Sequence, residues 1–298
     1  MKASLNESEL PLEESELVIN EDGSIFHLHL KPHQLADTIL IVGDQGRVKQ
    51  ISNHFDEIEH IVENREFVTH TGTYKGKRIS ALSTGIGADN IDIVMNELDA
   101  LVNINLETRK INKLPKSLTI IRIGTSGALQ PDIPVDSFVV SEFGLGFDGL
   151  AGFYKNLSNE IELDLEKAFF SQVNWSINTV KPYISEGNKE LIELLKSEAN
   201  SGITITGNGF YGPQGRVLRL KTKQENLNEQ LTNFEFNGLK MMNFEMETSA
   251  LYALGGMMGH KTATICAVIA NRFQKKYSEN YKATVDKMIE YVLGKLAG

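Results

Sequence analysis

The sequence predicts an α/β fold in which a sheet carries helices on both faces. Short apolar runs typical of buried strands, such as residues 38–42, alternate with segments whose apolar residues recur at helical spacing. Several runs end in glycine-containing turns, for example at residues 85–87 and 124–127. In such sheets ligands bind outside the carboxyl ends of the strands. Since no Pro-, Gly- or Ser-rich linker divides the 298 residues, we expect one domain at residues 23–298.

The expected elements follow one another along most of the chain. Strands are predicted from uninterrupted apolar runs at residues 38–42, 78–84, 117–123, 137–142, 203–206 and 262–270. Helices are predicted from apolar residues at helical spacing, at residues 47–55, 91–102, 188–198, 241–258 and 285–296. Alternation at residues 26–30 predicts a further strand with His27 and His29 on one face. Residues 1–22 are charged and aperiodic, which predicts a partly disordered N-terminal arm.

Composition excludes several classes of function. The chain has 39 acidic and 30 basic residues, and its net charge of -9 argues against a nucleic-acid partner. No apolar stretch approaches the roughly 20 residues that span a bilayer. The acidic N-terminus does not resemble a signal peptide. The single cysteine, Cys266, lies in an apolar run and is expected to be a buried structural thiol, with a nucleophile as the alternative. We therefore expect a protein of the reducing cytoplasm.

Five arginines lie beside glycines, turns or polar loop residues rather than on charged helix faces. They are Arg47, Arg65, Arg122, Arg216 and Arg272. In an acidic chain this placement indicates local binding of a small anion, because the planar guanidinium donates paired hydrogen bonds to phosphate or carboxylate.

Two of these arginines belong to candidate anion sites. Arg47 ends the sequence GDQGR, in which the turn at Gly43 and the following helix could hold an anion; a turn that only ends the strand is the alternative. Arg122 lies inside an apolar strand that ends in GTSG. It could hold an anion together with Thr125, or it could form a buried salt bridge, because an unpaired buried charge is costly.

The sequence FYGPQGR at residues 210–216 suggests recognition of a planar base. Gln214 and Arg216 are two positions apart, so on an extended backbone both would face the same way. Their donors and acceptor would fit an imide edge, and Phe210 could stack on a ring. A polar surface loop is the alternative.

Two carboxylates, Glu245 and Glu247, flank Met246 where a helix is expected to begin. They could accept hydrogen bonds from sugar hydroxyls while the methionine packs on the sugar, or they could cap the helix. The histidines at residues 27 and 29 could bind a metal, but no third ligand is evident, so no metal site is predicted.

Together these segments resemble the nucleoside phosphorylase-I family, over about residues 27–274 and in the family's order. The segments that carry the resemblance are residues 43–47, 64–67, 83–87, 121–125, 210–216, 245–247 and 271–272. The resemblance implies a three-layer α/β/α sandwich around a mixed, partly barrel-like sheet.

The resemblance also implies a role for each site residue. Phosphate is implied to bind Gly43, Arg47, Arg122 and Thr125, joined by Arg65 of a neighbouring subunit. Ribose is implied to bind Glu245, Met246 and Glu247, with His27 reaching across a dimer to the 5′-hydroxyl. The base is implied to bind Phe210, Gln214, Arg216 and Arg272. The catalytic residues among them are implied to be Arg122, Glu247, Gln214 and Arg216.

The implied activity is phosphorolysis of uridine to uracil and ribose 1-phosphate in nucleoside salvage, by a homodimer or a trimer of dimers. Inorganic phosphate is the implied co-substrate, and no cofactor is required. Purine-directed relatives keep an aspartate after the last core strand, whereas this chain has Asn271 there, which favours a pyrimidine. The alternatives are a purine nucleoside phosphorylase or nucleosidase of the same fold, or a catalytically silent nucleoside-binding protein.

The chain departs from the family at residues 88–90, which read ADN where uridine-cleaving members commonly have GPS. In some relatives this loop borders a monovalent-cation site at the subunit interface, so the departure leaves that cation without its usual loop, although Glu66 could contribute. Residues 1–22 and 220–238 also differ, and base and sugar preference could shift with them.

Overall fold

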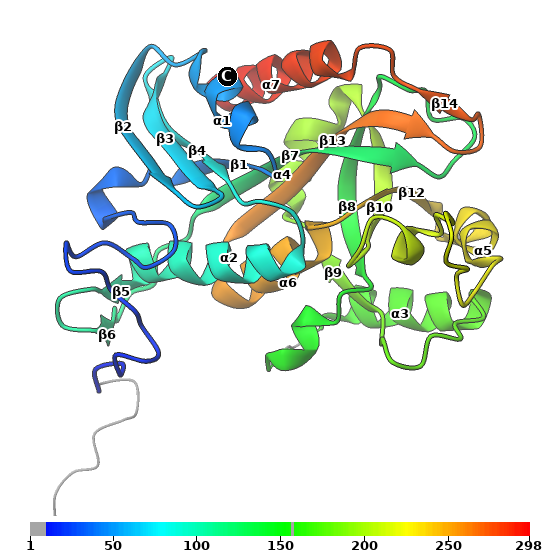
Figure 1. Ribbon diagram of the computed structural model, residues 1–298, viewed down its shortest axis with the longest axis horizontal. Coiled ribbons are helices and arrows are strands. Elements are labelled where there is room, and N and C mark those ends of the chain that lie inside the picture. Colours follow the sequence, from blue (N-terminus) through cyan, green and yellow to red (C-terminus); the bar gives the residue numbers. More distant parts are fainter. Residues whose placement is uncertain (1–9, 156–157) are drawn as a thin grey trace, which may run out of the picture. The chain divides into compact units, whose positions relative to one another are not determined.

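The computed structural model describes residues 10–155 and 158–298, which form two compact units. The first unit comprises residues 10–85 and 93–119, and the second comprises residues 86–92 and 120–298. Each unit combines strands with helices, and Figure 1 labels them along the chain.

Four strands form the sheet of the first unit, in the order β2, β3, β4, β1. Their bounds are β1 (Thr38–Val42), β2 (Glu57–Asn64), β3 (Phe67–Tyr74) and β4 (Lys77–Ser83). β1 and β4 are parallel, while the other pairs are antiparallel. Helix α1 (Gln45–Ser52) packs on β3 and β4 and buries Val48 and Ile51. Gly72 is needed where β3 passes β2, since a Cβ there would lie 2.1 Å from the Glu57 carbonyl oxygen.

The described part of the predicted N-terminal arm is held against the first unit. A short hairpin, β5 (Ile104–Asn105) and β6 (Lys110–Ile111), follows helix α2 (Ala88–Asn103). The backbone carbonyl of Arg109, in the hairpin turn, accepts from the Leu12 N–H (2.8 Å). Nη1 of the Arg109 side chain donates to the Leu17 carbonyl. Arg109 therefore holds this part of the arm at Leu12 and at Leu17, while residues 1–9 lie outside the described residues.

Five strands of the second unit close into a ring. They are β7 (Thr119–Ala128), β8 (Phe138–Gly146), β10 (Asn200–Thr206), β12 (Leu239–Glu245) and β13 (Lys261–Asn271). Neighbours around the ring are β12, β10, β8, β13 and β7, and β7 closes it by pairing with β12. β8–β10 and β10–β12 are parallel, whereas β8–β13 and β7–β12 are antiparallel. The prediction of an α/β fold with a mixed, partly closed sheet is confirmed.

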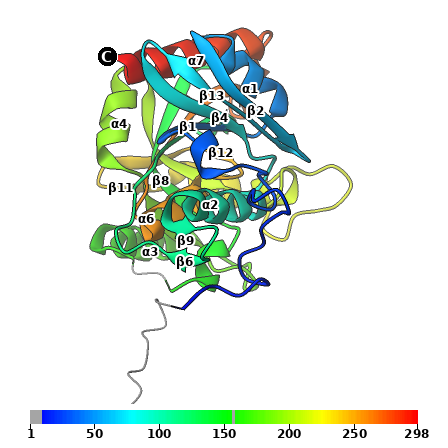
Figure 2. The same cartoon turned by 90° about the vertical axis from the view of Figure 1, so that its left-hand side faces the viewer.

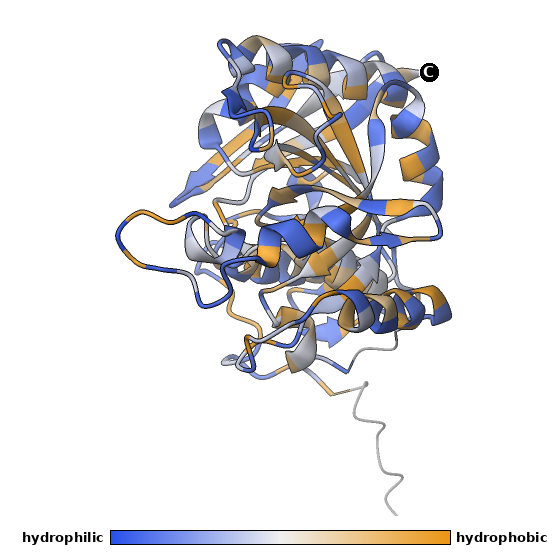
Figure 3. Ribbon diagram, turned by 90° about the vertical axis from the view of Figure 1, so that its right-hand side faces the viewer, coloured by the Kyte–Doolittle hydropathy of each residue, from blue (hydrophilic) through white to orange (hydrophobic). Residues whose placement is uncertain are grey.

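Short strands and helices surround this ring. The strands are β9 (Tyr183–Glu186) beside β8, β11 (Glu235–Phe236) beside β12 and β14 (Lys276–Tyr277) beside β13. The helices are α3 (Glu160–Gln172), α4 (Lys189–Leu195), α5 (Leu227–Asn233), α6 (Thr248–Met258) and α7 (Tyr281–Ala297). α6 packs on β8, β9, β10 and β13, while α4 and α7 pack on β13. Figure 2 gives a second view of these helices, and Figure 3 shows hydrophobic strands between helices of mixed hydropathy.

Apolar burial explains why the second unit keeps this arrangement. A buried hydrophobic cluster joins strands β8, β10 and β12 to helices α3 and α5, and it includes Phe169, Ile205 and Leu231. The only tryptophan, Trp175, packs on this cluster with its ring 4.7 Å from that of Phe147. Burial of such side chains stabilises a fold by about 1.5–3 kcal/mol each.

Two predictions of secondary structure are wrong. Residues 26–30 form a turn rather than a strand, because His29 has a left-handed backbone (φ 56°) and the Ile25 N–H bonds the Leu30 carbonyl (2.9 Å). The two histidines therefore do not share a strand face. The helix predicted at residues 241–258 is a strand, β12, followed by helix α6. The apolar residues of β12 are buried within the sheet, so their spacing does not distinguish strand from helix.

Candidate active site

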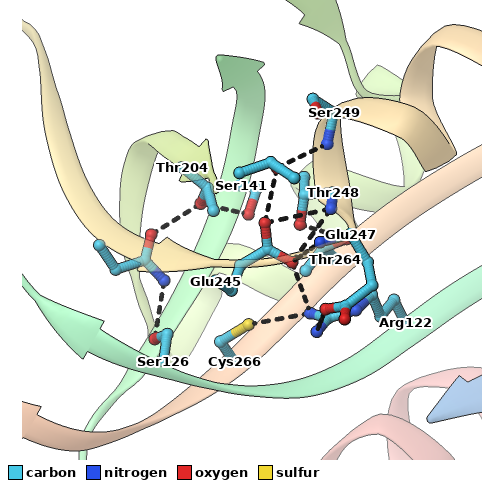
Figure 4. Close-up of polar contacts among 12 residues, drawn as sticks. Arg122, Ser126, Ser141, Thr204, Glu245, Glu247, Thr248, Ser249, Thr264 and Cys266 are labelled. Carbon is cyan, nitrogen blue, oxygen red and sulfur yellow. Dashed lines mark hydrogen bonds and ion pairs between the residues drawn. The ribbon is translucent and has the colours of Figure 1, made fainter. Parts of the chain in front are cut away.

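Arg122 and two carboxylates form a buried cluster where β7 and β12 approach each other (Figure 4). Nη1 of Arg122 lies 3.0 Å from Oε2 of Glu245, and Nη2 donates to Glu247. All three side chains are at most 7% exposed. The salt bridge that the sequence left open as an alternative is therefore present, and Arg122 carries it from a buried part of β7 between Ile121 and Ile123.

The two carboxylates have different surroundings. Glu245 ends β12 and accepts from the Thr206 hydroxyl (2.7 Å) and from the backbone N–H groups of Glu247 (2.9 Å) and Thr248 (3.0 Å). It thus satisfies the first free N–H groups of α6, which is the capping role considered above. Glu247 is the N-cap residue of α6 but makes no side-chain cap; it accepts instead from the Gly87 N–H (2.7 Å).

The cluster has one positive charge for two carboxylates. Burial alone would lower the pKa of the Arg122 guanidinium, but the charges of Glu247 and Glu245 outweigh it and hold that pKa above its usual range. Burial raises the pKa of Glu247, and the charge of Arg122 opposes this shift. With Arg122 always protonated, the cluster bears a surplus of negative charge whenever both carboxylates are ionised. Such a site favours positive charge on a bound molecule.

Cys266 on β13 lies against the same guanidinium, whose Nη1 is 3.4 Å from the sulfur. Burial raises the pKa of this thiol to about 12, although the charge of Arg122 opposes the shift. The side chain is fully buried, as the sequence predicted, and a protonated thiol of this kind is a poor nucleophile.

Side-chain hydrogen bonds hold the strand ends that carry the cluster. Asn243 on β12 donates to the Ser126 hydroxyl on β7 (2.8 Å) and accepts from Thr204 on β10 (2.7 Å). Thr125, which precedes Ser126 on β7, is half-buried, and so is Met246 between the two carboxylates. These bonds fix the register of three strands beside the cluster.

The predicted base-binding residues also meet in space. Arg216 Nη1 donates to the Phe210 carbonyl and to Oε1 of Gln214, and its Cζ lies 3.7 Å from the centre of the Phe210 ring. Arg272 Nη1 donates to the Gln214 carbonyl, and its guanidinium lies 5.4 Å from the ring centre of Phe244. Gln214, at 2% exposure, is therefore the centre of this group, whereas Phe210 is half exposed.

The backbone that brings Gln214 and Arg216 together is not extended. Residues Gly212–Gln214 form a 3-10 turn, and Gly215 has a left-handed backbone (φ 70°). The extended backbone expected for Gln214 and Arg216 is therefore wrong, because the chain folds back at Gly215 instead of continuing as a strand. The glycine allows this turn without strain.

The group predicted to bind the base, which is Phe210, Gln214, Arg216 and Arg272, is positively charged, in contrast to the carboxylate cluster. Burial lowers the pKa of Arg216, and burial together with the charge of Arg216 lowers the pKa of Arg272 to about 10. Within the described ranges neither arginine pairs with a carboxylate, and Nη2 of Arg272 is buried without a hydrogen-bond partner. Phe244 and Glu245 are consecutive on β12, so the two groups are neighbours of opposite charge.

A cavity of about 690 Å³ lies beside the base-binding turn. Arg216, Tyr211 and Trp175 line it, but the carboxylate cluster does not.

Four predicted site residues lie in the first unit. Gly43 follows β1, and Asp44 then caps α1 by accepting from the Gly46 N–H (2.9 Å), so a helix-starting turn is present. Arg47 occupies the first turn of that helix. Arg65 is exposed in the β2–β3 turn with a left-handed backbone (φ 55°). Their phosphate roles stay predictions.

His27, the fourth of these residues, is paired with Glu97 of α2, a residue that sequence reasoning missed. The Nδ1 of His27 lies 2.6 Å from Glu97 Oε1. Glu97 lies on a helix recognised by its apolar stripe, and nothing in the sequence marks its polar face. Among the residues described, no three metal-binding side chains gather in a way that could hold an ion, and no helix is long and apolar enough to cross a membrane.

The fold and these charged groups define an α/β protein with a buried carboxylate–arginine cluster. Beside it lie two arginines, Arg216 and Arg272, that pair with no carboxylate of the described ranges. The sequence model of the phosphorylase superfamily matches residues 37–294, and the chain belongs to that family.

Several individual members of this family are similar to the chain in sequence or in structure. The chain is 30% identical to a uridine phosphorylase of Thermococcus kodakarensis over 265 residues, which cover 87% of this chain and 82% of the relative. It is 26% identical to a DeoD-type purine nucleoside phosphorylase of Geobacillus stearothermophilus over 274 residues, 90% of this chain and 96% of the relative. Its structure is similar to that of a Trypanosoma brucei nucleoside phosphorylase with uridine phosphorylase activity, with a TM-score of 0.86 and 28% identity over 94% of this chain and 99% of the other.

Proposed function

We propose that this chain is a pentosyltransferase that cleaves uridine with inorganic phosphate, giving uracil and ribose 1-phosphate. The observation that carries the proposal is the pair of oppositely charged groups joined by β12. The carboxylates of Glu245 and Glu247 surround Arg122, and Arg216 and Arg272 meet around Gln214. The similarity to uridine phosphorylases supports the choice of substrate.

This charge arrangement suits cleavage of a glycosidic bond. As the bond to the base breaks, positive charge develops on the ribose and negative charge on the leaving uracil. Preorganised charges that face these developing charges stabilise the transition state. The surplus negative charge of Glu245 and Glu247 favours the positive charge that develops on the ribose. Nη2 of Arg272, which has no hydrogen-bond partner in the described residues, favours the negative charge that develops on uracil. No covalent intermediate is needed, because phosphate itself attacks the anomeric carbon.

The ribose and base roles follow from the same contacts. Glu247 would accept from the 2′-hydroxyl, and Met246 would pack on the sugar. Gln214 and Arg216 would bond the edge of uracil while Phe210 covers its face. Each of these roles is a proposal that the resemblance suggests and the positions of the side chains support.

The proposed phosphate site includes Arg122, together with donors from other segments of the chain. Arg122 is already engaged by two carboxylates, so it would contribute as a shared donor rather than as a free cation. Gly43, Arg47 and Thr125 would supply the remaining donors, with Arg65 from a neighbouring subunit. Shared sites of this kind require a homodimer or a trimer of dimers.

Phosphate serves as the co-substrate, and we propose that no cofactor is required. A monovalent cation at the subunit interface would lack the usual loop at residues 88–90. We also propose that the protein works in the cytoplasm.

A purine nucleoside phosphorylase is the strongest alternative, because a purine-directed relative aligns over most of the chain. Asn271 argues against it. Its Nδ2 donates to the carbonyls of Gln130 (2.9 Å) and Ile133 (2.8 Å), so the side chain at this position fastens a loop and offers no acid to a leaving purine.

One assay tests the proposal directly. Purified protein is incubated with uridine, with and without inorganic phosphate, and the products are separated by chromatography. We expect uracil and ribose 1-phosphate only when phosphate is present. Uracil formed without phosphate would identify a nucleosidase, faster cleavage of inosine would identify a purine enzyme, and binding without turnover would identify a silent nucleoside-binding protein.

A further inference from the structure

Glu97 holds the turn that carries His27 through several hydrogen bonds to one carboxylate. Its oxygens accept from the backbone N–H of His27 (2.9 Å) and from the backbone N–H of Leu28 (2.8 Å). The His27 imidazole contributes a third bond through Nδ1, at 2.6 Å. Asn64 donates to the His27 carbonyl (2.8 Å) and so secures the other side of the turn. The carboxylate is largely buried, at 12% exposure.

The ring of His27 is also fixed in orientation. It packs edge-on against Phe26, with ring centres 4.7 Å apart, and against the buried Phe67, with ring centres 6.4 Å apart. Because Nδ1 faces Glu97, Nε2 lies on the far side of the ring. Within the described residues Nε2 makes no hydrogen bond, and the imidazole is 29% exposed.

We propose that Glu97 is a positioning residue that sets the tautomer of His27 and thereby its recognition of the ribose 5′-hydroxyl. The inference rests on the proposed function and on the contact between His27 and that hydroxyl that the resemblance to the family implies. An ionised carboxylate can only accept a hydrogen bond, so neutral His27 must carry its proton on Nδ1. Nε2 then presents a lone pair, which accepts from a hydroxyl.

Two possible roles of Glu97 make different predictions. If Glu97 only stabilised the turn, its loss would affect every substrate alike. If it set the tautomer, its loss would matter only for substrates that have the 5′-hydroxyl. The substitution Glu97→Gln separates these roles, because an amide oxygen can still accept from the backbone N–H groups, while the amide N–H₂ cannot accept from Nδ1.

The kinetic experiment compares uridine with 5′-deoxyuridine in the wild type, in Glu97→Gln and in His27→Ala. We expect Glu97→Gln to lower kcat/KM for uridine roughly tenfold, mainly by raising KM, as for loss of one hydrogen bond to substrate. For 5′-deoxyuridine the same variant should match the wild type. In the His27→Ala background, Glu97→Gln should have no further effect on uridine. An exposed carboxylate of the same unit, changed in Glu107→Gln, is the control for loss of charge and should leave both substrates unaffected.

A second readout is independent of turnover. Nitrogen NMR of the imidazole, assigned by its absence in His27→Ala, should show the Nδ1–H tautomer in the wild type and in Glu107→Gln. Glu97→Gln should move it to the Nε2–H tautomer. An unchanged tautomer in Glu97→Gln, or equal losses on the two nucleosides, would overturn the inference. If the wild type does not cleave uridine, the proposed function fails, and the nitrogen spectra still decide whether Glu97 sets the tautomer.

Discussion

Arg122 donates to Glu247 inside the second unit, where neither side chain is more than 7% exposed. The two residues are 125 positions apart in the chain. Removing one partner of a buried pair leaves a charge that is neither solvated nor compensated. This pair therefore couples the stability of the fold to the proposed chemistry at the ribose.

Substitution of Arg122 should affect stability as well as activity. Arg122→Ala leaves Glu245 and Glu247 without their cation, and we expect a loss of about 3–5 kcal/mol in the free energy of unfolding, measured in urea. Lys261→Ala removes an exposed pair with Glu190 and is the control, with an expected loss of at most about 1 kcal/mol. Equal losses of unfolding free energy in the two variants would show that the buried cluster stabilises the fold no more than an exposed ion pair does. Arg122→Lys keeps a charge but lacks the fork, so uridine phosphorolysis should fall sharply.

A methyl group at Gly124 should displace Arg122 without removing it. A Cβ at this position would lie 2.2 Å from Arg122 Nη1 and 2.8 Å from the Cys266 sulfur. We expect Gly124→Ala to lower kcat/KM for uridine on the order of 100-fold through misplacement of the guanidinium. Gly256→Ala, in helix α6 with no atom within 4 Å of the new Cβ, is the matched control and should keep full activity. Normal turnover by Gly124→Ala would mean that the position of Arg122 does not matter.

Gln214 and Gln224 are both buried glutamines but should respond differently to alanine. Gln214→Ala removes the acceptor for Arg216 and the proposed contact to uracil, so kcat should fall by about 10²–10³, as for loss of a preorganised donor. Gln224 accepts from the Ser176 N–H and hydroxyl (3.0 Å each), outside the base-binding group. Gln224→Ala should therefore lower the melting temperature and leave the turnover of the folded protein unchanged. Parallel losses of stability and turnover in Gln214→Ala would make that residue structural.

Asn271→Asp tests whether an acid at this position can create purine activity. The carboxylate would face the carbonyls of Gln130 and Ile133, which now accept from Nδ2. We expect a loss of about 2–3 kcal/mol in stability, because a donor is replaced by a charged acceptor, and no gain in inosine cleavage. Inosine phosphorolysis by this variant, at unchanged stability, would show that the side chain is free to reach a base.

The burial of Cys266 and the raised pKa of its thiol predict slow alkylation in the native protein and a pH-dependent free energy of unfolding. With a pKa of about 12 in the fold and an ordinary value of 9.0, the thiol should resist alkylation in the native protein and react once it is unfolded. The unfolded chain releases this proton at lower pH than the folded chain does. Cys266 should therefore lower the free energy of unfolding as pH rises from 9.0 towards 12, and it should have no such effect below that window. Cys266→Ala should flatten this part of the stability profile; an unchanged slope, or rapid native alkylation, would contradict the burial.

Local patterns were sufficient to predict most of the elements of the sheet. The strands at residues 38–42 and 262–270 and the helices at residues 91–102 and 285–296 lie within observed elements. β2 and β3 are not predicted, since β2 is exposed or half-buried without a strong apolar run, and in β3 threonines, a histidine and a glycine interrupt the apolar residues. The residues of β12 are predicted as helix because burial on both faces of the strand removes the alternation of apolar and polar residues that distinguishes a strand from a helix.

The candidate site was predictable in its residue types but not in its pairings. The glycines and the proline at residues 212–215 are a local feature, and so Gln214 and Arg216 could be named from the sequence, whereas Arg272 was named from the resemblance to the family. Which groups they bond is a long-range property. Arg272 is 58 positions from Gln214, and nothing in either segment indicates that they meet.

By itself, the sequence determined the class of fold, the family and the types of side chain that serve the proposed reaction, because strand periodicity, glycine turns and charged residues are local features of a chain. Only the tertiary structure decided that five strands close into a ring, that Glu245 caps α6 while Glu247 binds the Gly87 N–H, and that Glu97 holds His27. The physical reason is that a buried charge must be compensated by whichever groups the packed strands and helices bring to it. Spacing along the chain does not record that choice.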